Sequence, residues 1–352
     1  MKILKNKEPY TLIGIIYIIK GWILVDSVPI ICYNNSQRKV VFTLEYITAR
    51  QAADKWNISD RRVRIMCSEG MIEGVIRQGR SYQIPIDAVK PLDGRTFRGK
   101  DIDEKYKALF RRIDSKKEEL STRRPLTQGE LKRLQEEFLL EFTYNSNAIE
   151  GNTLTLQETA MVLEGITIDK KPLKDHLEAV GHKDAFEYVK QLVLNQQELS
   201  EKIIKEIHSL VLMDRREDRG VYRKIPVRIM GAANEPPQPS MVPALMEKLM
   251  KEHIEMKKRL HIIELAARFH MDFEGIHPFI DGNGGTARLL LNFELMQNGY
   301  LPINIKFTDR RKYYECFTAY HQEADAEPII RMVSEYIENE YDRYLDMLQK
   351  DV

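Results

Sequence analysis

The chain has 352 residues, a length typical of about two domains. Hydrophobic residues make up 43%, charged residues 30%, and the mean hydropathy is −0.42; this soluble globular composition excludes a disordered or collagen-like chain. Lys and Arg number 54 and Asp and Glu number 53, so the net charge of +1 holds no basic excess that would draw the whole chain to nucleic acid. The cysteines form no CxxC pair, which argues against a disulfide scaffold or a structural zinc site and indicates the cytoplasm: Cys32, Cys67 and Cys316.

Residues 1–43 differ in composition from the rest of the chain, and we assign them no function. The apolar run 12–19 follows three lysines, as in a signal peptide, but no small-residue cleavage site comes after it. Lys20 and Asp26 interrupt the longer apolar stretch, whereas a membrane-spanning helix needs about 20 nearly uninterrupted apolar residues. We therefore expect no stable membrane association. A β-rich extension, or sequence upstream of the folding unit, is favoured over a membrane anchor or a secretory signal.

Residues 44–92 have the pattern of a helix-turn-helix unit. Thr48 is a good N-cap, and three apolar residues fall on one face of the helix that it would begin: Ala52, Ala53 and Trp56. After a tight turn, Ser59 can cap a second helix over 60–68. Two short helices joined in this way predict a helix-turn-helix, and a hairpin is predicted next, over 75–84, with its turn at Gln78-Gly79.

Basic side chains lie where such a unit would meet DNA. The candidate contacts are arginines near the start of the second helix and beside the hairpin tip: Arg61, Arg62, Arg64, Arg77 and Arg80. The segment resembles the winged helix-turn-helix of the excisionase and MerR type, which implies DNA as a partner. Acidic residues at 60, 69 and 73 dilute the positive charge, so a small packing domain with solvated arginines is the alternative. The polar, turn-rich segment 93–100 is the predicted linker.

From residue 101 to 352 the apolar spacing predicts a mainly α fold, with apolar residues at intervals of three or four. The clearest amphipathic stretches are 131–142, 203–212, 241–256, 261–273 and 329–348. We therefore expect a helical domain after the linker.

The segment 277–288, HPFIDGNGGTAR, concentrates groups that bind phosphate and move protons. It is predicted to join two helices, the second running from Thr286 to Gln297. Glycines around an asparagine before a helix form a nest of backbone N–H groups for an anion, and the helix N-terminus adds positive potential. Arg288, in the first helical turn, can clamp a phosphate, Asp281 is a hard ligand for Mg2+, and His277 can take a proton from a hydroxyl near neutral pH.

This segment resembles the Fic family signature, HPFx(D/E)GNGRxxR. The resemblance implies a helical Fic (Fido) fold with a short β-hairpin flap, and transfer of AMP from Mg-ATP to a hydroxyl of a target protein. It implies that His277 is the general base and that Asp281 binds Mg2+. It further implies that Asn283 and Arg288 hold the phosphates, and the ATP-binding loop is completed by Gly282, Gly284 and Gly285.

Gly285 is a departure from the signature, because the family usually has its first arginine at this position. Loss of a hydrogen bond to a charged group costs about 1.5–3 kcal/mol, which would weaken nucleotide binding roughly 10- to 100-fold. A lysine from elsewhere could compensate, or the preferred nucleotide could differ.

Upstream, residues 146–152 (SNAIEGN) resemble the family's inhibitory motif, (S/T)xxxE(G/N). The resemblance implies that Glu150 pairs with Arg288 and keeps the enzyme self-inhibited, at the end of an inhibitory helix over 127–152. The alternative is an ordinary helix C-terminus, with Gly151 in a left-handed conformation and Glu150 exposed.

Two more stretches extend the resemblance. Residues 227–234, followed by two prolines, are expected to form the flap, along which a target strand could pair, although an ordinary surface hairpin is the alternative. Its candidate ATP contacts are Met230, Gly231, Ala232 and Ala233. Tyr313 is the expected adenine contact or, alternatively, a plain core tyrosine. His321 stands where an asparagine is frequent, which leaves base selectivity open.

The resemblance spans about 120–340, with a Fido core at about 199–334 inside a Fic region at 101–352. The preferred function is a self-inhibited protein adenylyltransferase with an accessory DNA-binding module. The alternatives are removal of AMP, or transfer of another phosphate-containing group, at the same site, and a non-enzymatic regulator that senses nucleotide. The expected partner is a protein with a modifiable Ser, Thr or Tyr hydroxyl, and a homodimer stays open. His261 and His270 match no zinc motif, so a zinc enzyme is not expected.

Overall fold

The computed structural model describes residues 18–19, 22–23, 30–33, 39–42, 46–56, 58–68, 72, 74–79, 81–86, 88, 90, 104–228 and 235–349. The chain divides into two compact units, Met1–Pro91 and Leu92–Val352. This division falls at the start of the predicted linker, which itself lies outside the described residues.

The described part of residues 1–43 consists of two antiparallel strand pairs. Strand β1 (Ile18–Ile19) pairs with β2 (Trp22–Ile23), and β3 (Ile30–Tyr33) pairs with β4 (Lys39–Phe42). The β-rich alternative therefore describes these residues. Within the described ranges of the chain, no helix is both long enough and apolar enough to cross a membrane.

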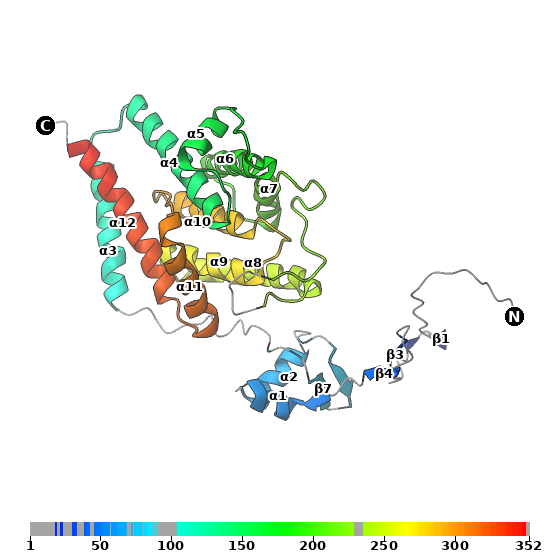
Figure 1. Cartoon of the computed structure of the whole chain (residues 1–352). Coiled ribbons are helices and arrows are strands. Elements are labelled where there is room, and N and C mark those ends of the chain that lie inside the picture. The colour runs from blue at the N-terminus through cyan, green and yellow to red at the C-terminus, as the bar shows by residue number, and fades with distance from the viewer. Residues whose placement is uncertain are drawn as a thin grey trace. The chain divides into compact units, whose positions relative to one another are not determined.

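The rest of the first unit combines two helices with a three-stranded antiparallel sheet (Figure 1). Its elements are β5 (Tyr46–Thr48), α1 (Ala49–Trp56), α2 (Asp60–Ser68), β6 (Ile76–Gln78) and β7 (Ser81–Pro85), and the sheet order is β5–β7–β6. Both predicted helices are present, and both caps form. Backbone N–H groups of Gln51 and Arg62 donate to the hydroxyls of Thr48 and Ser59, each at 3.3 Å. The apolar face of α1 packs in the core of this unit with Val63, Met66 and Ile84.

Two details of this unit differ from the expectations. Gln78 pairs with Ser81, so Gln78 belongs to the strand and the hairpin turn begins only after it. Gly79 has φ +59°, a conformation that favours glycine in a two-residue turn. Strand β5 was not predicted, because three residues are too few to show an alternating pattern. Its pairing with the distant strand β7 creates it.

All the regular secondary structure that is described for the second unit is helical. Its α-helices are α3 (Glu104–Thr122), α4 (Gln128–Ile149), α5 (Leu156–Leu163), α6 (Leu173–Leu194), α7 (Glu201–Val211), α8 (Val242–Lys257), α9 (Ile262–Ile276), α10 (Asn283–Gln297), α11 (Arg310–Gln322) and α12 (Glu327–Gln349). Two 3-10 helices, η1 (Pro239–Met241) and η2 (Phe307–Asp309), complete it. The mainly α fold is confirmed.

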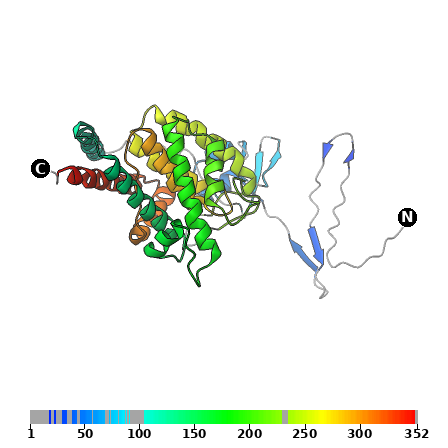
Figure 2. The ribbon, with the colours of Figure 1, turned by 90° about the horizontal axis from the view of Figure 1, so that it is seen from above.

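Helices α9 and α10 form the centre of this unit and position its site. Every residue from Asn283 to Leu295 is buried, and so is nearly all of α9. On one side the pair shares an apolar core with α3, α11 and α12, and on the other with α4, α6, α7 and α8. Helices α3 and α12 run side by side at one edge of the unit (Figure 1 and Figure 2). The loop between α9 and α10 is thus held by a rigid helix at each end.

One expectation for this unit needs correction, and another, the flap, stays a prediction. Helix α10 begins at Asn283 rather than Thr286, with Gly282 as N-cap at φ +72°, so Arg288 lies in the second turn. The described residues on both sides of the predicted flap, 221–228 and 235–238, form no strand. The flap's centre, with Met230, Gly231, Ala232 and Ala233, lies outside the described residues.

Candidate active site

The loop between α9 and α10 is held in shape by hydrogen bonds from one of its own neighbours, Asn283. The Asn283 side chain accepts a hydrogen bond from the backbone N–H of Phe279 and donates one to its carbonyl, each at 2.9 Å. The backbone of His277 has the left-handed conformation, φ 50° and ψ 60°, and its carbonyl accepts from Nε of Arg223 at 2.8 Å. The Asn283 amide is therefore committed to the loop, and its predicted role in holding a phosphate stays a prediction.

His277 lies within ion-pair distance of a buried carboxylate one helical turn earlier, although its Nδ1 makes no hydrogen bond to the described residues. Its Nδ1 lies 3.4 Å from Oε2 of Glu274, whose side chain is 8% exposed, while the His277 side chain is 17% exposed. Burial alone would raise the pKa of Glu274, but its neighbours, foremost His277, lower it below the ordinary value for glutamate. An ionised Glu274 would hold a proton on Nδ1 and leave Nε2 as the basic nitrogen.

Ser146, Glu150 and Arg288 form what we call the arginine cluster. The Arg288 guanidinium is 2% exposed; Nε donates to Oγ of Ser146 at 2.9 Å, and Nη2 donates to its carbonyl at 2.9 Å. Nη2 also donates to Oε1 of Glu150 at 2.8 Å. Burial alone would lower the pKa of Arg288, but the Glu150 carboxylate raises it above the ordinary value.

The Glu150 carboxylate lies against the N-terminus of α10. A Cβ added to Gly284, in the first turn, would sit 2.1 Å from Oε1 of Glu150 and 3.1 Å from Nη1 of Arg288. Only glycine permits this approach. A carboxylate thus lies beside the first turn of α10, where the glycine pattern predicts an anion. Glu150 is also the C-cap of α4, its side chain is 47% exposed, and Gly151 has φ +94°. The two interpretations of residues 146–152 are therefore compatible.

Asp281, Lys174 and Arg215 form a second group, the rim cluster. Oδ2 of Asp281 lies 3.5 Å from Nζ of Lys174 and 3.3 Å from Nη2 of Arg215, and all three side chains are 40–45% exposed. Oδ1 of Asp281 accepts from the backbone N–H of Gly282 at 2.9 Å.

A single accessible carboxylate fits a divalent ion that takes most of its ligands from phosphate oxygens and water, as Mg2+ does. Within the described ranges, no three His, Cys, Asp or Glu side chains are grouped to hold a metal without such help.

Gly285 faces two other helices rather than the loop. A Cβ at this position would lie 3.2 Å from Cγ1 of Val211 on α7 and 3.7 Å from Cδ2 of His182 on α6. His182 is fully buried, and burial together with Arg288 lowers its pKa to about 3. No cationic side chain starts from Gly285, but the rim cluster brings two cations to the adjacent loop.

Of the two residues expected near the adenine, Tyr313 is packed into the core and His321 is half-buried. Tyr313 is 1% exposed, and its hydroxyl lies 2.7 Å from Nε2 of His270, as in the core-tyrosine alternative. His321 packs on α9, where a Cβ on Gly275 would lie 2.5 Å from its Cε1, and burial foremost lowers its pKa to about 4. Tyr314, by contrast, is 46% exposed, and its hydroxyl donates to the Ile149 carbonyl at 3.0 Å, next to Glu150.

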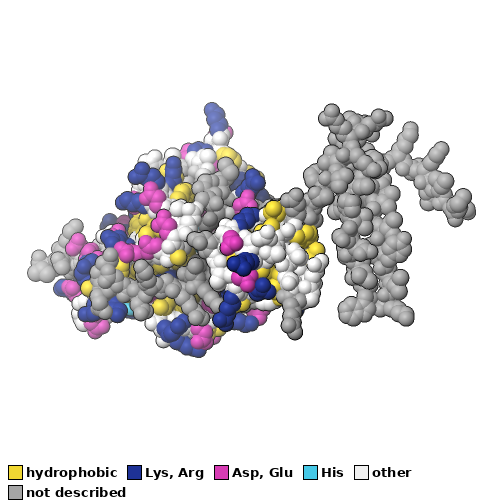
Figure 3. All heavy atoms as spheres, turned by 90° about the horizontal axis from the view of Figure 1, so that it is seen from below, with side chains coloured by type: hydrophobic (Ala, Val, Ile, Leu, Met, Phe, Trp, Pro, Cys, Tyr) yellow, Lys and Arg dark blue, Asp and Glu magenta, His cyan; other side chains and the backbone are white. Residues whose placement is uncertain are grey.

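The basic residues predicted to contact DNA lie on α2 and the hairpin of the first unit. Arg61, Arg64 and Arg77 are exposed and Arg62 is half-buried, while Arg80 lies outside the described residues. Nε of Arg64 donates to Oδ2 of Asp60 at 2.8 Å. On the face shown in Figure 3, Lys and Arg side chains are interspersed with Asp and Glu.

Sequence reasoning missed the roles of Glu274, Lys174 and Arg215. The spacing of Glu274, three residues before His277 and directly after the predicted helical stretch 261–273, was an available signal for their contact. Lys174 and Arg215 come from separate segments with no motif around them, and only packing brings them to Asp281.

The fold and site define a helical protein with a histidine, a glycine-rich anion nest and a buried arginine around one loop. The Fic/DOC family model matches residues 198–295. A Fic domain-containing signalling protein from Bacteroides thetaiotaomicron is 30% identical, with a TM-score of 0.62, over 69% of this chain and 98% of that one. Fic-1 (residues 134–508) from C. elegans is 29% identical, with a TM-score of 0.61, over 68% and 71% of the two chains.

A curated relative, protein adenylyltransferase Fic of Drosophila yakuba, is 35% identical over 237 residues. These residues make up 66% of this chain and 47% of the relative, so the chain spans about half the length of the curated relatives that it matches. With the near-complete match to the Bacteroides structure, the chain belongs to the Fic/DOC family.

Proposed function

We propose that this protein is a protein adenylyltransferase that transfers AMP from Mg-ATP to a Ser, Thr or Tyr hydroxyl of a target protein and is inhibited by its own Glu150. The observation that carries the proposal is the contact of the Glu150 carboxylate with both Arg288 and the N-terminus of α10. An anion site next to a partly exposed histidine suits phosphate chemistry. The names of the curated relatives support the same activity.

In the proposed reaction, the target hydroxyl oxygen attacks the α-phosphorus of ATP. A new O–P bond forms, the bond from the α-phosphorus to the oxygen that bridges to the β-phosphate breaks, and pyrophosphate leaves. His277 accepts the hydroxyl proton through Nε2, because Nδ1 faces Glu274. The N–H groups of the first turn of α10 and the Arg288 guanidinium hold phosphate oxygens in line for this attack. Asp281 would hold Mg2+, which neutralises phosphate charge when bound.

The proposed inhibition is a competition for one guanidinium. Glu150 takes the Arg288 nitrogen and the space over Gly284 that a phosphate would need. ATP could then bind only with its phosphates out of register, and a small misplacement costs a large factor in rate. Because the Glu150 side chain is 47% exposed whereas Arg288 is 2% exposed, the glutamate is the partner that can leave.

Transfer of label from α-labelled ATP to lysate proteins by wild type and Glu150→Gly tests this function. The variant should label itself or a target strongly, and wild type should label weakly. ATP binding without any labelling by either protein would favour the nucleotide-sensing regulator. Loss of label from a previously modified target would favour AMP removal.

We also propose that residues 44–92 form a winged helix-turn-helix that binds DNA through α2 and the β6–β7 hairpin. The exposed arginines on both elements support this proposal. A gel shift with the full chain tests it. Combined Arg61→Ala and Arg77→Ala should weaken binding and reduce its salt dependence, because phosphate contacts release counterions. Wild type that shifts no DNA at low salt would favour the packing-domain alternative.

A further inference from the structure

Two cations reach the loop between α9 and α10 through long ion pairs with Asp281. Lys174, on α6, and Arg215, four residues after α7, approach Asp281 at 3.5 and 3.3 Å. Lys174 also lies 3.3 Å from Glu178, and Arg215 lies 3.9 Å from Asp214. All four contacts are longer than a usual hydrogen bond, and exposed ion pairs of this kind contribute little to stability, so their partners exchange readily.

A buried group independently points to an anion at this place. Nη1 of Arg288 is buried and, among the described residues, has no hydrogen-bond partner. It lies 3.1 Å from the position of a Cβ on Gly284, in the first turn of α10. Glu150 satisfies Nη2 but not Nη1. A buried charged donor without an acceptor is costly, so the nest is built for a larger anion than one carboxylate.

The position of Gly285 connects this nest with the rim cluster. A side chain there would start between His182 of α6 and Val211 of α7. Lys174 and Arg215 come from these same two parts of the fold: the N-terminus of α6 and the loop after α7. Lys174 and Arg215 thus come from the two parts of the fold that a side chain at position 285 would face.

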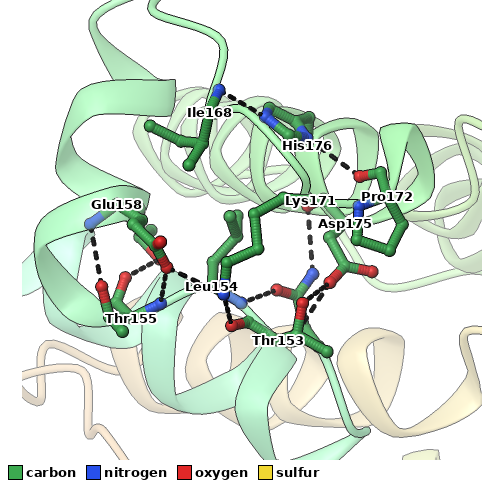
Figure 4. A network of polar contacts seen from close by, with 11 residues as sticks. Thr153, Leu154, Thr155, Glu158, Ile168, Lys171, Pro172, Asp175 and His176 are labelled. Carbon is green, nitrogen blue, oxygen red and sulfur yellow. Dashed lines mark hydrogen bonds and ion pairs between the residues drawn. The ribbon is translucent and has the colours of Figure 1, made fainter.

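The segment that follows Glu150 holds the N-terminus of α6 in place (Figure 4). The backbone N–H of Thr153 donates to Oδ2 of Asp175 at 2.8 Å, and Nδ2 of Asn152 donates to the Asp175 carbonyl at 3.0 Å. The same Nδ2 donates to Oε2 of Glu178 at 2.8 Å. Lys174 directly precedes Asp175, so these hydrogen bonds connect the backbone at Lys174 to the segment that follows Glu150.

We propose that Lys174 and Arg215 bind the β- and γ-phosphates of ATP and supply the charge that Gly285 does not provide. This inference rests on the proposed function and names the residues that select a triphosphate. Without nucleotide, the two cations neutralise Asp281. With nucleotide, they turn to the phosphates that leave as pyrophosphate. They are phosphate-binding residues, so their removal should affect ATP and spare ligands that lack the β- and γ-phosphates.

Nucleotide titration by calorimetry in the Glu150→Gly background tests the inference. Combined Lys174→Ala and Arg215→Ala should weaken Mg-ATP binding by about 10-fold or more, the effect of lost charge-assisted hydrogen bonds. AMP binding should change little. Lys202→Ala is the matched control. Lys202 is an exposed lysine near the start of α7, and its Nζ lies 3.7 Å from Oε1 of Glu206. Its removal should change neither affinity.

Restoration of charge gives the sharper result. Lys174→Arg should keep Mg-ATP affinity, and Gly285→Arg should restore it in the double-alanine protein. Thermal unfolding of Gly285→Arg in the Glu150→Gly background shows whether the chain accepts the larger side chain beside Val211. Unchanged Mg-ATP affinity in the double-alanine protein, or equal losses for ATP and AMP, would overturn the inference. If Glu150→Gly binds ATP but labels no protein, the proposed function fails, and the affinities still decide on Lys174 and Arg215.

Discussion

The arginine cluster and the rim cluster lie beside the same loop, but they hold their charges in different ways. Arg288 is 2% exposed and makes three hydrogen bonds of 2.8–2.9 Å, whereas the rim pairs are 40–45% exposed and stand 3.3–3.5 Å apart. A buried charge needs close partners because water no longer solvates it, while water and salt screen an exposed one. The buried arginine is thus a fixed reference point, and the rim can rearrange around a ligand.

This difference predicts which substitutions act on the chemical step and which act on binding. Substitutions on the buried side of the site should alter the rate of AMP transfer, because the buried groups have fixed partners and cannot readjust. Changes on the rim should alter affinity and metal dependence, because the remaining charges adjust.

The largest effect is expected at His277. His277→Ala should lower labelling in the Glu150→Gly background by about 100- to 10,000-fold, the usual contribution of a general base. Nucleotide affinity should hardly change, because the imidazole faces Glu274 and not the nest. Single-turnover labelling and ATP titration measure the two quantities. More than a tenth of the activity remaining would remove His277 from this role.

The arginine cluster should respond next most strongly. Glu150→Gly should raise autolabelling roughly 10- to 100-fold over wild type, because the triphosphate gains the register for in-line attack. Glu150→Gly combined with Arg288→Ala should lose this gain, because the freed clamp is itself removed. Autolabelling of the three proteins side by side is the measurement. Equal activity of wild type and Glu150→Gly would reduce Glu150 to a helix cap.

A smaller effect is expected on the rim. Asp281→Ala should raise the Mg2+ concentration needed for half-maximal ATP binding, by about 10-fold, because the ion loses its one protein carboxylate. The variant should still fold, since Asp281 is 40% exposed. Titration of Mg2+ against bound nucleotide provides the measurement. An unchanged requirement would limit Asp281 to capping the Gly282 N–H group.

The last expected effect is on the pH dependence of stability, at His182 beside the arginine cluster, and not on activity. Burial lowers the pKa of His182 from an ordinary 6.5 to about 3, so below pH 6.5 the unfolded chain binds a proton that the folded ring does not. The free energy of unfolding should therefore fall as the pH drops from 6.5 towards 3, by up to about 1.4 kcal/mol per pH unit from this group. His182→Leu should make the slope shallower in denaturant titrations. An unchanged pH dependence would mean that the His182 ring can be protonated in the folded protein.

Much of the second unit could be predicted from local patterns. The stretches 203–212, 241–256, 261–273 and 329–348 all lie in helices within a few residues of their expected ends. Helix periodicity and capping act over neighbouring residues, so the chain itself contains the signal. Very short elements and the exact ends of helices were harder to predict. The three-residue strand β5 depends on a partner 35 residues later, and the start of α10 depends on the Asn283 hydrogen bonds.

The sequence by itself determined the helical class, the Fic signature at 277–288 and the identity of the glutamate that meets Arg288, because each is written in contiguous residues. Only the tertiary structure decided that Tyr313 is a core residue and that Lys174 and Arg215 converge on Asp281. These contacts join side chains from α6, α9, α11 and the loops after α7 and α9. Their distances depend on how whole helices pack, and no local pattern encodes that packing.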